Sequence, residues 1–455
     1  MIAIPFPLNM RLLMNLPDDF HCDLMVHSRW IIPIIPEDII HENCTLLVSD
    51  GDIVAIVPTE EAKRRYRAKE IIDLPQHVVM PGLINAHGHA AMSLFRGYAD
   101  DLTLQTWLND HIWPAEGKHV SADFVRAGTQ LAVAEMIRSG TTCFSDMYFF
   151  PDEVAGVAHG AGIRCQIAFP ILEFPSAWAK NADDYINKGL NLHDEYRSHP
   201  LIQVNFGTHA PYTVSDDSFR RIAIISAEMQ ACIQVHLHET EKEVEDAKEL
   251  DGRRPIRRLY ELDVITPLTQ CVHMTTLEDE DIEILQKSGA HVVHCPESNL
   301  KLASGLCPVA RLLDAGVNVA LGTDSCASNN DLDMFGEMHT AALLGKAVAK
   351  DASVLNAHQV LRIATINGAR ALNIDEQTGS LEVGKSADFI ALALDPMDQS
   401  PLYNLASQLI YTHNGQRVTH SWVKGKALLR DRELETLNAS DIINQTNEWQ
   451  RRISG

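Results

Sequence analysis

The chain has 455 residues, 45% hydrophobic and 22% charged, a composition typical of a globular protein that buries a sizeable core. It carries 38 Lys and Arg against 61 Asp and Glu, a formal net charge of −23, which argues against a nucleic-acid partner because such proteins present a basic face. No apolar run reaches the roughly 18–20 residues that a membrane span needs, so we expect no membrane partner either.

The amino-terminal part is predicted to be β-rich. The first 22 residues lack a basic start, a continuous apolar centre and a cleavage site, so we interpret them as an extension rather than a signal peptide. Residues 23–79 then show two apolar stretches with a Ser-Asp-Gly-Asp turn, a pattern typical of hairpins. Residues 380–430 show the same kind of pattern. We therefore expect both ends of the chain to build one small β-sandwich.

Eight short apolar and β-branched runs follow in the middle of the chain. Continuous apolar runs are typical of strands buried on both faces, as in parallel sheets. The runs are 82–87, 141–146, 163–169, 202–209, 232–238, 270–274, 291–295 and 318–324.

Helical patterns fill the gaps between these runs. The clearest begins after Ser121, a plausible N-cap, and stops at Gly140; others cover 216–231 and 277–289. Alternating strands and helices predict an α/β fold, a (β/α)8 TIM barrel. A doubly wound sheet is the alternative, but no G-x-G-x-x-G follows any of the strands.

The expected organisation has three parts along the chain. Residues 1–79 form the amino-terminal part of the sandwich, 80–378 the barrel, and 379–455 the carboxyl-terminal part of the sandwich with a terminal helix. The nine cysteines are scattered singly, without a C-x-x-C pair, and several lie in apolar runs. They are predicted to be reduced thiols of the core, which favours a cytoplasmic protein.

Polar residues stand at the end of nearly every predicted barrel strand. Active sites of such barrels lie at the carboxyl ends of the strands. One histidine there is usually a structural hydrogen-bonding group, but a set gathered at one rim indicates a site. The strand-end residues are His87, His89, Asp146, His209, His236, His238, Glu239, His273, His294 and Asp324.

These residue types suit a catalytic metal. Zinc prefers nitrogen and carboxylate ligands and keeps one position open for water. His87, His89, Asp324 and one histidine of the fifth strand would satisfy it. Since His236 and His238 are two positions apart, they are expected on the same side, and spacing does not choose between them. The P-C-x-x-C element of cysteine-liganded deaminases is absent.

Several motifs together resemble a known superfamily. PGLINAHGHAAM, VHLHET, CVHM and LGTDSCASNNDLDMF resemble the amidohydrolases, and GSLEVGKSADFIAL resembles their cytosine-deaminase-like branch. Within that branch, TWLNDHIWPAE, GTHAPYTVSD and HCPESNLKLASG are similar to the 5-methylthioadenosine/S-adenosylhomocysteine deaminases. The resemblance covers the chain from about residue 23.

The resemblance implies a role for each matching residue. The metal ligands would be His87, His89, His236 and Asp324. Glu239 would shuttle protons, His273 would orient the attacking water, and Asp324 would accept its proton. Substrate contacts would come from Trp107, Glu116, His209, Glu239 and Asp324. The fourth strand, IQVNFGTHA, has no lysine to bridge two metals, so one divalent ion is expected, Zn²⁺ with Fe²⁺ as the alternative.

The implied reaction is hydrolytic deamination of an adenine nucleoside. Relatives that accept S-adenosylhomocysteine tend to place an arginine near the end of the third strand; here CQIAFPILEFPSAW has no cation before Lys180. A buried carboxylate without a cationic partner is costly. We therefore expect 5′-methylthioadenosine to be converted to 5′-methylthioinosine and ammonia, with S-adenosylhomocysteine and adenosine as further candidates. A cation from elsewhere, such as a neighbouring subunit, would alter this preference.

Other interpretations remain open from the sequence. The alternative function is a deaminase or chlorohydrolase of guanine, a pterin or a triazine in the same superfamily. A non-catalytic barrel and an amide hydrolase with a carboxylated lysine are further alternatives. The long segment 88–120 is predicted to fold over the pocket as a lid. A homodimer or higher homo-oligomer is expected.

Overall fold

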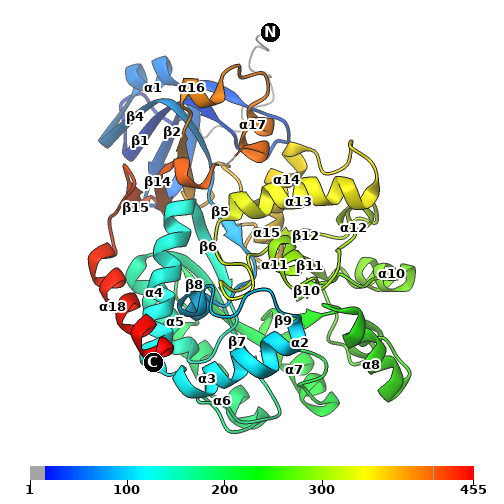
Figure 1. Ribbon diagram of the computed structural model, residues 1–455. Helices are drawn as coiled ribbons and strands as arrows, with labels where there is room; N and C mark the ends of the chain where they lie inside the picture. Colours follow the sequence, from blue (N-terminus) through cyan, green and yellow to red (C-terminus); the bar gives the residue numbers. More distant parts are fainter. Residues whose placement is uncertain (1–15, 413) are drawn as a thin grey trace.

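The computed structural model of the protein describes residues 16–412 and 414–455 (Figure 1). The prediction for the start of the chain therefore lies largely outside the described residues. Two eight-stranded sheets organise the described part: one is made from the middle of the chain, and the other from its two ends. Segments from the beginning and the end of the chain lie side by side in Figure 1.

The middle sheet is the predicted barrel. Its strands pair in chain order from β5 to β12, and all of these pairs are parallel. The Ala86 amide donates to the Leu321 carbonyl at 2.9 Å, and the Asp324 amide donates to the His87 carbonyl at 3.1 Å, so the two edges meet. The (β/α)8 prediction is confirmed. The strands are β5 (Leu83–Asn85), β6 (Thr141–Asp146), β7 (Arg164–Ile171), β8 (Ile202–Thr208), β9 (Ile233–Leu237), β10 (Thr269–His273), β11 (His291–His294) and β12 (Val319–Leu321).

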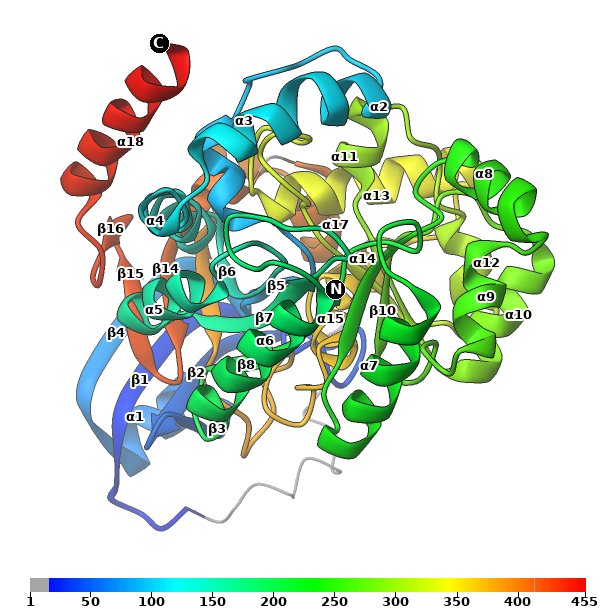
Figure 2. The same ribbon diagram turned by 90° about the horizontal axis from the view of Figure 1, so that it is seen from below.

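Helices surround this sheet, as Figure 2 shows. The predicted helix after Ser121 is α4 (Ala122–Ser139); the Ser121 hydroxyl accepts from the Phe124 amide at 3.3 Å, and Gly140 ends the helix with φ +97°. The others are α5 (Pro151–Ala161), α6 (Ala182–Tyr196), α7 (Asp216–Met229), α8 (Glu241–Asp251), α9 (Pro255–Glu261), α10 (Asp279–Ser288), α11 (Pro296–Lys301), α12 (Val309–Asp314), α13 (Met334–Ala349), α14 (Ala357–Ile363) and α15 (Ile366–Ala371).

The second sheet joins both ends of the chain. Its order is β16-β15-β14-β13-β4-β1-β2-β3, and the antiparallel pair β4–β13 connects the two halves. Val26 and Leu46 pack in one buried cluster with Phe389 and Trp422, so side chains from both ends share a core. The strands are β1 (Phe20–Ile31), β2 (His41–Ser49), β3 (Asp52–Pro58), β4 (Tyr66–Pro81), β13 (Phe389–Ala393), β14 (Val418–Val423), β15 (Lys426–Arg430) and β16 (Glu433–Leu434).

Short helices complete these end segments. Helix α1 (Thr59–Arg65) lies between β3 and β4, and α18 (Ala439–Ser454) ends the chain against α4, where Trp449 meets Phe124 edge to face. The remaining elements are α16 (Pro396–Gln399), α17 (Leu405–Tyr411) and η3 (Gly415–Arg417).

A long segment with short helical turns follows β5. It contains η1 (Ala90–Phe95), α2 (Leu104–Thr106), the π-helical η2 (Trp107–Ile112) and α3 (Trp113–His119). Its first turn packs tightly on α4 at Gly128, which has no side chain. A Cβ atom at this position would lie only 2.3 Å from the Ala91 carbonyl oxygen. This close packing fixes the chain directly after His89.

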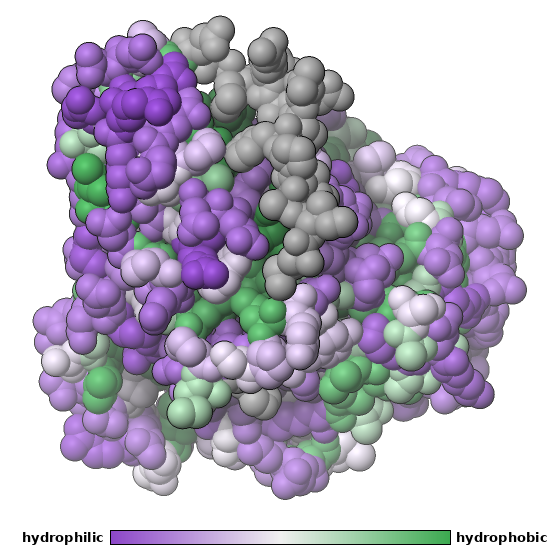
Figure 3. Space-filling model, turned by 90° about the horizontal axis from the view of Figure 1, so that it is seen from above, coloured by the Kyte–Doolittle hydropathy of each residue, from purple (hydrophilic) through white to green (hydrophobic). Residues whose placement is uncertain are grey.

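The surface and the cysteines agree with the composition. The face drawn in Figure 3 is mostly hydrophilic, with smaller hydrophobic areas between. All nine cysteines are free thiols with buried side chains, as predicted for small core residues. Among the described helices, none has the length and apolar character needed to cross a bilayer.

Candidate metal centre and active site

Four of the predicted metal ligands converge at the carboxyl ends of the barrel strands. The Nε2 atoms of His87 and His236 lie 3.2 Å apart. Asp324 Oδ1 lies 3.2 Å from His89 Nε2 and 3.6 Å from His87 Nε2. The residues come from β9 and from the segments that follow β5 and β12, so the barrel brings together positions more than 230 residues apart in sequence.

Hydrogen bonds orient all three imidazoles in the same way. The Nδ1 atom of His87 faces Gln234 Oε1 at 2.8 Å, that of His89 faces the Met147 carbonyl at 2.6 Å, and that of His236 faces the His209 carbonyl at 2.7 Å. Each partner is an oxygen that only accepts, so each Nδ1 carries the hydrogen and donates it. The Nε2 atoms are therefore left with lone pairs pointing into the shared centre.

This arrangement fits a metal ion. Two lone pairs that face each other at 3.2 Å, as on His87 and His236, repel unless a cation lies near both. Two nitrogens bound tetrahedrally to one zinc at about 2.0–2.1 Å would lie about 3.3 Å apart. Candidate ligand groups are His87, His89 and Asp324, and His87, His236 and His273. The three imidazoles and the carboxylate are the donor types that zinc prefers.

Asp324 is held by hydroxyl groups and by an unusual backbone conformation. Its Oδ2 accepts from Ser298 Oγ at 2.5 Å and from Ser328 Oγ at 3.0 Å, which leaves Oδ1 for the centre. Its φ of +59° lies in the left-handed region that residues other than glycine seldom adopt. Gly322, directly after β12, lets this part of the chain approach His87. Any larger residue would clash there, since a Cβ atom on Gly322 would lie only 2.8 Å from the His87 carbonyl oxygen.

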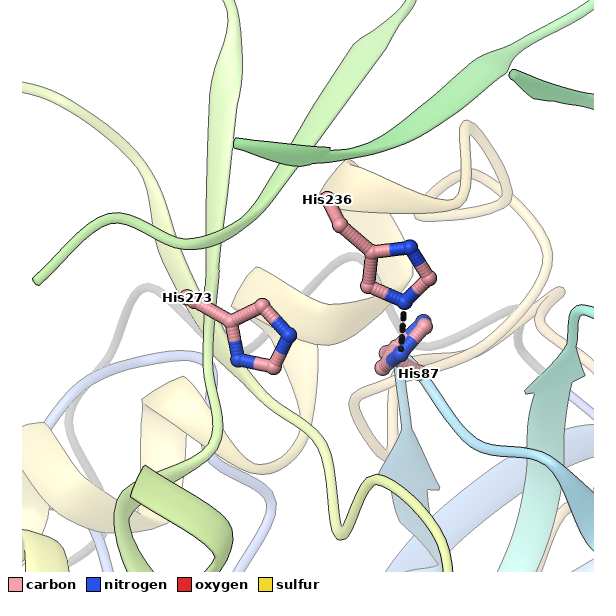
Figure 4. A group of neighbouring side chains, drawn as sticks. All are labelled: His87, His236 and His273. Carbon is pink, nitrogen blue, oxygen red and sulfur yellow. Dashed lines mark hydrogen bonds between the residues drawn. The ribbon is translucent and has the colours of Figure 1, made fainter. Parts of the chain in front are cut away.

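His273 lies beside the cluster, with its ring nearly parallel to that of His236 (Figure 4), but the hydrogen of its imidazole is on the other nitrogen. Asn299 Nδ2 donates to His273 Nδ1 at 3.0 Å, so the hydrogen of this imidazole is on Nε2. His273 Nε2 lies 3.7 Å from Glu239 Oε2. Its φ of +77° is again left-handed. His273 therefore presents a hydrogen-bond donor to the centre, whereas the other histidines present acceptors.

Burial controls the charges of this site. Burial raises the pKa of Glu239 to about 8, and the nearby negative charge of Asp324 adds to the rise. Burial lowers the pKa of His87 and of His273 to about 4. At neutral pH, Glu239 is therefore mainly a protonated acid, and these imidazoles are neutral. Burial would also lower the pKa of His89, but its bond to Asp324 raises it to about 9. Without a cation, the Nε2 atom of His89 would therefore carry a proton toward Asp324, and a bound metal ion would take the place of that proton.

A cavity of about 590 Å³ opens over the cluster. Its wall includes two groups of residues. The strand-end residues are His89, His209, His236, Glu239, His273 and Asp324, and the lid residues are Leu104, Trp107, Leu108, Ile112, Trp113 and Glu116. The predicted lid therefore forms part of the wall. A second cavity, of about 430 Å³, lies at the other end of the barrel strands, where Arg164, Ile202 and Cys232 line it.

The predicted substrate contacts all line the larger cavity. Glu116 Oε1 accepts a hydrogen bond from the Tyr148 hydroxyl at 2.6 Å. Burial raises the pKa of Glu116 to about 7, although the bond from Tyr148 acts to lower it. The indole N–H of Trp107 is buried without a hydrogen-bond partner, and His209 Nδ1 lies 3.0 Å from Thr213 Oγ1. The cavity thus offers a carboxylate, and one of its wall residues, Trp107, has an unpaired indole N–H.

Three of the strand-end residues neither join the cluster nor line the cavity. His238 has φ +53°, and its ring lies between the Thr276 carbonyl and the Ile256 amide, which donates to Nε2 at 3.1 Å. Asp146 Oδ1 accepts from the Ala90 amide at 2.5 Å. His294 is buried and does not line the cavity. The expectation that His236 and His238 share a side is therefore wrong, because the chain turns after Leu237.

Sequence reasoning missed several polar residues of the site. Gln234 bonds His87, Tyr148 bonds Glu116, and Asn299 bonds His273. Gln234 could have been found, since it precedes His236 by two positions on one strand and therefore faces the barrel interior with it. Tyr148 and Asn299 carry no comparable local signal.

Known proteins resemble the chain over nearly its whole length. The family model named "Amidohydrolase family" matches residues 78–428. A "5-methylthioadenosine/S-adenosylhomocysteine deaminase" of Saccharophagus degradans is 55% identical over 431 residues, which are 95% of this chain and 97% of that protein. A "5'-deoxyadenosine deaminase" of Methanococcoides burtonii is 39% identical over 429 residues, which are 94% of this chain and 96% of that protein.

Solved structures give the same result. The crystal structure of an adenosine deaminase from Xanthomonas campestris with bound zinc superposes with a TM-score of 0.95 at 44% identity, covering 96% of this chain and 99% of that one. The matched family model spans more than half of the 455 residues, including all eight barrel strands and the candidate metal ligands at their ends. The chain belongs to the amidohydrolase family.

Proposed function

We propose that this protein is a zinc-dependent deaminase of adenine nucleosides, and that its preferred substrate is 5′-methylthioadenosine, which it converts to 5′-methylthioinosine and ammonia. The observation that carries the proposal is the convergence of three imidazole lone pairs and Asp324 at the floor of a cavity, beside the protonated acid Glu239. The names of the three similar proteins described above, which are nucleoside deaminases, support the substrate class.

The proposed ligands of the ion are His87, His89, His236 and Asp324. A bound zinc ion would lower the pKa of a water molecule that it binds from 15.7 to about 7. The remaining steps belong to side chains. His273 donates from Nε2 to the attacking oxygen and fixes its direction. Asp324 accepts the proton that this oxygen releases, through the Oδ1 that its serine partners leave free.

Glu239 is proposed to deliver a proton to the purine. Because its pKa is about 8, it can donate to N1 of the adenine ring at neutral pH. Protonation of N1 withdraws electron density from C6, where the nucleophile adds. The Glu239 carboxylate can then take the proton of the new C6 hydroxyl and give it to the amine, so that the C6–N bond breaks, the carbonyl forms and ammonia leaves. The proton held by Asp324 then restores the acid form of Glu239. General acid–base steps of this kind contribute about 10²- to 10⁴-fold each.

The ribose and the 5′ substituent are proposed to lie against the lid. The Glu116 carboxylate can accept hydrogen bonds from two vicinal hydroxyls, and the free indole N–H of Trp107 can donate to the nucleoside. Among the described residues that line the cavity, there is no Lys or Arg, while Leu172, Phe174 and Ile112 supply apolar surface. A methylthio group suits this wall, whereas the amino-acid carboxylate of S-adenosylhomocysteine would lose its hydration without a cationic partner.

The test is a deamination panel with zinc content measured on the same sample. The panel contains methylthioadenosine, 5′-deoxyadenosine, adenosine and S-adenosylhomocysteine, with guanine as the free base. We expect the highest kcat/KM for methylthioadenosine and a value at least about tenfold lower for S-adenosylhomocysteine, which corresponds to 1.4 kcal/mol. Equal values for these two would refute the preference. Ammonia release from guanine alone would favour the alternative function.

A further inference from the structure

A row of buried glutamines runs through the interior of the barrel. Gln166, Gln203, Gln234 and Gln270 come from the consecutive strands β7 to β10, and Gln166, Gln234 and Gln270 are at most 2% exposed. Barrel interiors are usually filled by branched apolar side chains. A buried amide without partners costs about 1–3 kcal/mol, so three of them are retained only if they are bonded.

The amides are bonded to one another in a single direction. Gln234 Nε2 donates to Gln270 Oε1 at 2.6 Å, and Gln270 Nε2 donates to Gln166 Oε1 at 2.8 Å. Gln166 Nε2 then donates to Gln203 Oε1 at 3.4 Å, at the wall of the smaller cavity. The upper end of the row is the bond between Gln234 Oε1 and His87 Nδ1.

Backbone carbonyls determine this direction. Each buried amide nitrogen also donates to a carbonyl oxygen: Gln234 to Ala86 at 3.1 Å, Gln270 to Ala371 at 2.8 Å and Gln166 to Leu372 at 3.0 Å. A flipped amide would place its own oxygen against that carbonyl, and two acceptors repel. The oxygen of Gln234 is therefore held toward His87, independently of what His87 does.

We propose that Gln234 is a positioning residue of the metal centre. It requires His87 to carry its hydrogen on Nδ1 and so directs the Nε2 lone pair to the ion, while Gln270 keeps the Gln234 amide from turning. This inference rests on the proposed metal centre. Partners of this kind typically contribute about 10- to 100-fold to metal affinity.

The test measures zinc affinity by competition with a chromogenic chelator. Gln234→Met keeps the volume of the side chain but removes the acceptor, and Gln166→Met makes the same change two amides away from His87. We expect Gln234→Met to bind zinc about 10- to 100-fold more weakly and Gln166→Met to stay within about threefold of the wild type. Gln234→Glu keeps an acceptor for His87, and burial favours its protonated form, which retains one donor toward the Ala86 carbonyl or Gln270 Oε1. Its zinc affinity should therefore be closer to that of the wild type than the affinity of Gln234→Met.

Each outcome decides the matter. A folded Gln234→Met protein with unchanged zinc affinity would overturn the proposal, as would an equal loss in Gln166→Met, which would indicate a general effect of core packing. If Gln234→Met does not fold, the zinc affinity of Gln270→Met is measured instead. We expect this affinity to fall severalfold, and an unchanged zinc affinity would contradict the inference. A wild-type protein that binds no zinc removes the inference, whereas one that binds zinc but deaminates neither methylthioadenosine nor the other adenine nucleosides of the panel removes only the proposed function.

Discussion

The hydrogen bond between Tyr148 and Glu116 leads to a prediction about pH. Tyr148 follows strand β6, and Glu116 lies in helix α3 of the lid; the Tyr148 hydroxyl oxygen is 2.6 Å from Glu116 Oε1. The carboxyl group accepts well from both ribose hydroxyls at once only when it is ionised, because a protonated oxygen becomes a donor, and its pKa is about 7. The Tyr148 hydroxyl bonds the ionised form and so lowers this pKa. We predict that Tyr148→Phe raises the pKa of Glu116 and weakens binding of ribosylated substrates near neutral pH.

The size of the effect follows from the bond that is lost. A hydrogen bond to a charged group contributes about 1.5–3 kcal/mol, which corresponds to about one to two pKa units. The pKa of Glu116 then moves from about 7 to about 8–9. At about pH 7.5 the ionised fraction falls from about three quarters to between about a quarter and 3%, so kcat/KM should fall about 3- to 25-fold.

The assay is the pH profile of kcat/KM for methylthioadenosine in both proteins. The deficit of Tyr148→Phe should shrink as the pH rises and nearly vanish at about pH 9.5, where Glu116 is mostly ionised in either protein. With 2′,3′-dideoxyadenosine, which lacks both hydroxyls, the two proteins should differ little. Tyr212→Phe is the matched control, since Tyr212 lines the same cavity and is 58% exposed.

Two results would refute this reasoning. A loss that is the same at every pH would mean that Tyr148 only shapes the cavity wall. An equal loss with the dideoxy substrate would mean that Glu116 does not contact the ribose.

Two further predictions concern chemistry and stability. Glu239→Gln should retain zinc, because Glu239 is not a proposed ligand, but lose nearly all turnover as the protonated acid is removed; metal analysis and ammonia release check this, and near-normal activity would remove Glu239 from its proposed role. Ser121→Ala removes the N-cap bond to the Phe124 amide and should lower the free energy of unfolding by about 1 kcal/mol with unchanged kcat/KM. A denaturation midpoint equal to that of the wild type would contradict the second prediction.

Local sequence determined the strands and most of the strand-end residues. Apolar runs predicted all eight barrel strands, because strands buried on both faces need continuous apolar side chains. The polar residues at their carboxyl ends then had to share one rim, since parallel strands in a barrel end on the same side. The prediction that both ends of the chain combine likewise followed from hairpin patterns and agrees with the single sheet that joins β4 to β13.

Only the tertiary structure decided which of these polar groups meet. His236 and His238 are equivalent by period, but β9 ends at Leu237 and the left-handed backbone of His238 turns its ring away. The bond of Tyr148 to Glu116 joins residues 32 positions apart, and the bond of His87 to Gln234 joins residues 147 apart. Such contacts depend on the register between strands and on the placement of the lid, and neither is encoded in a local pattern of residue types.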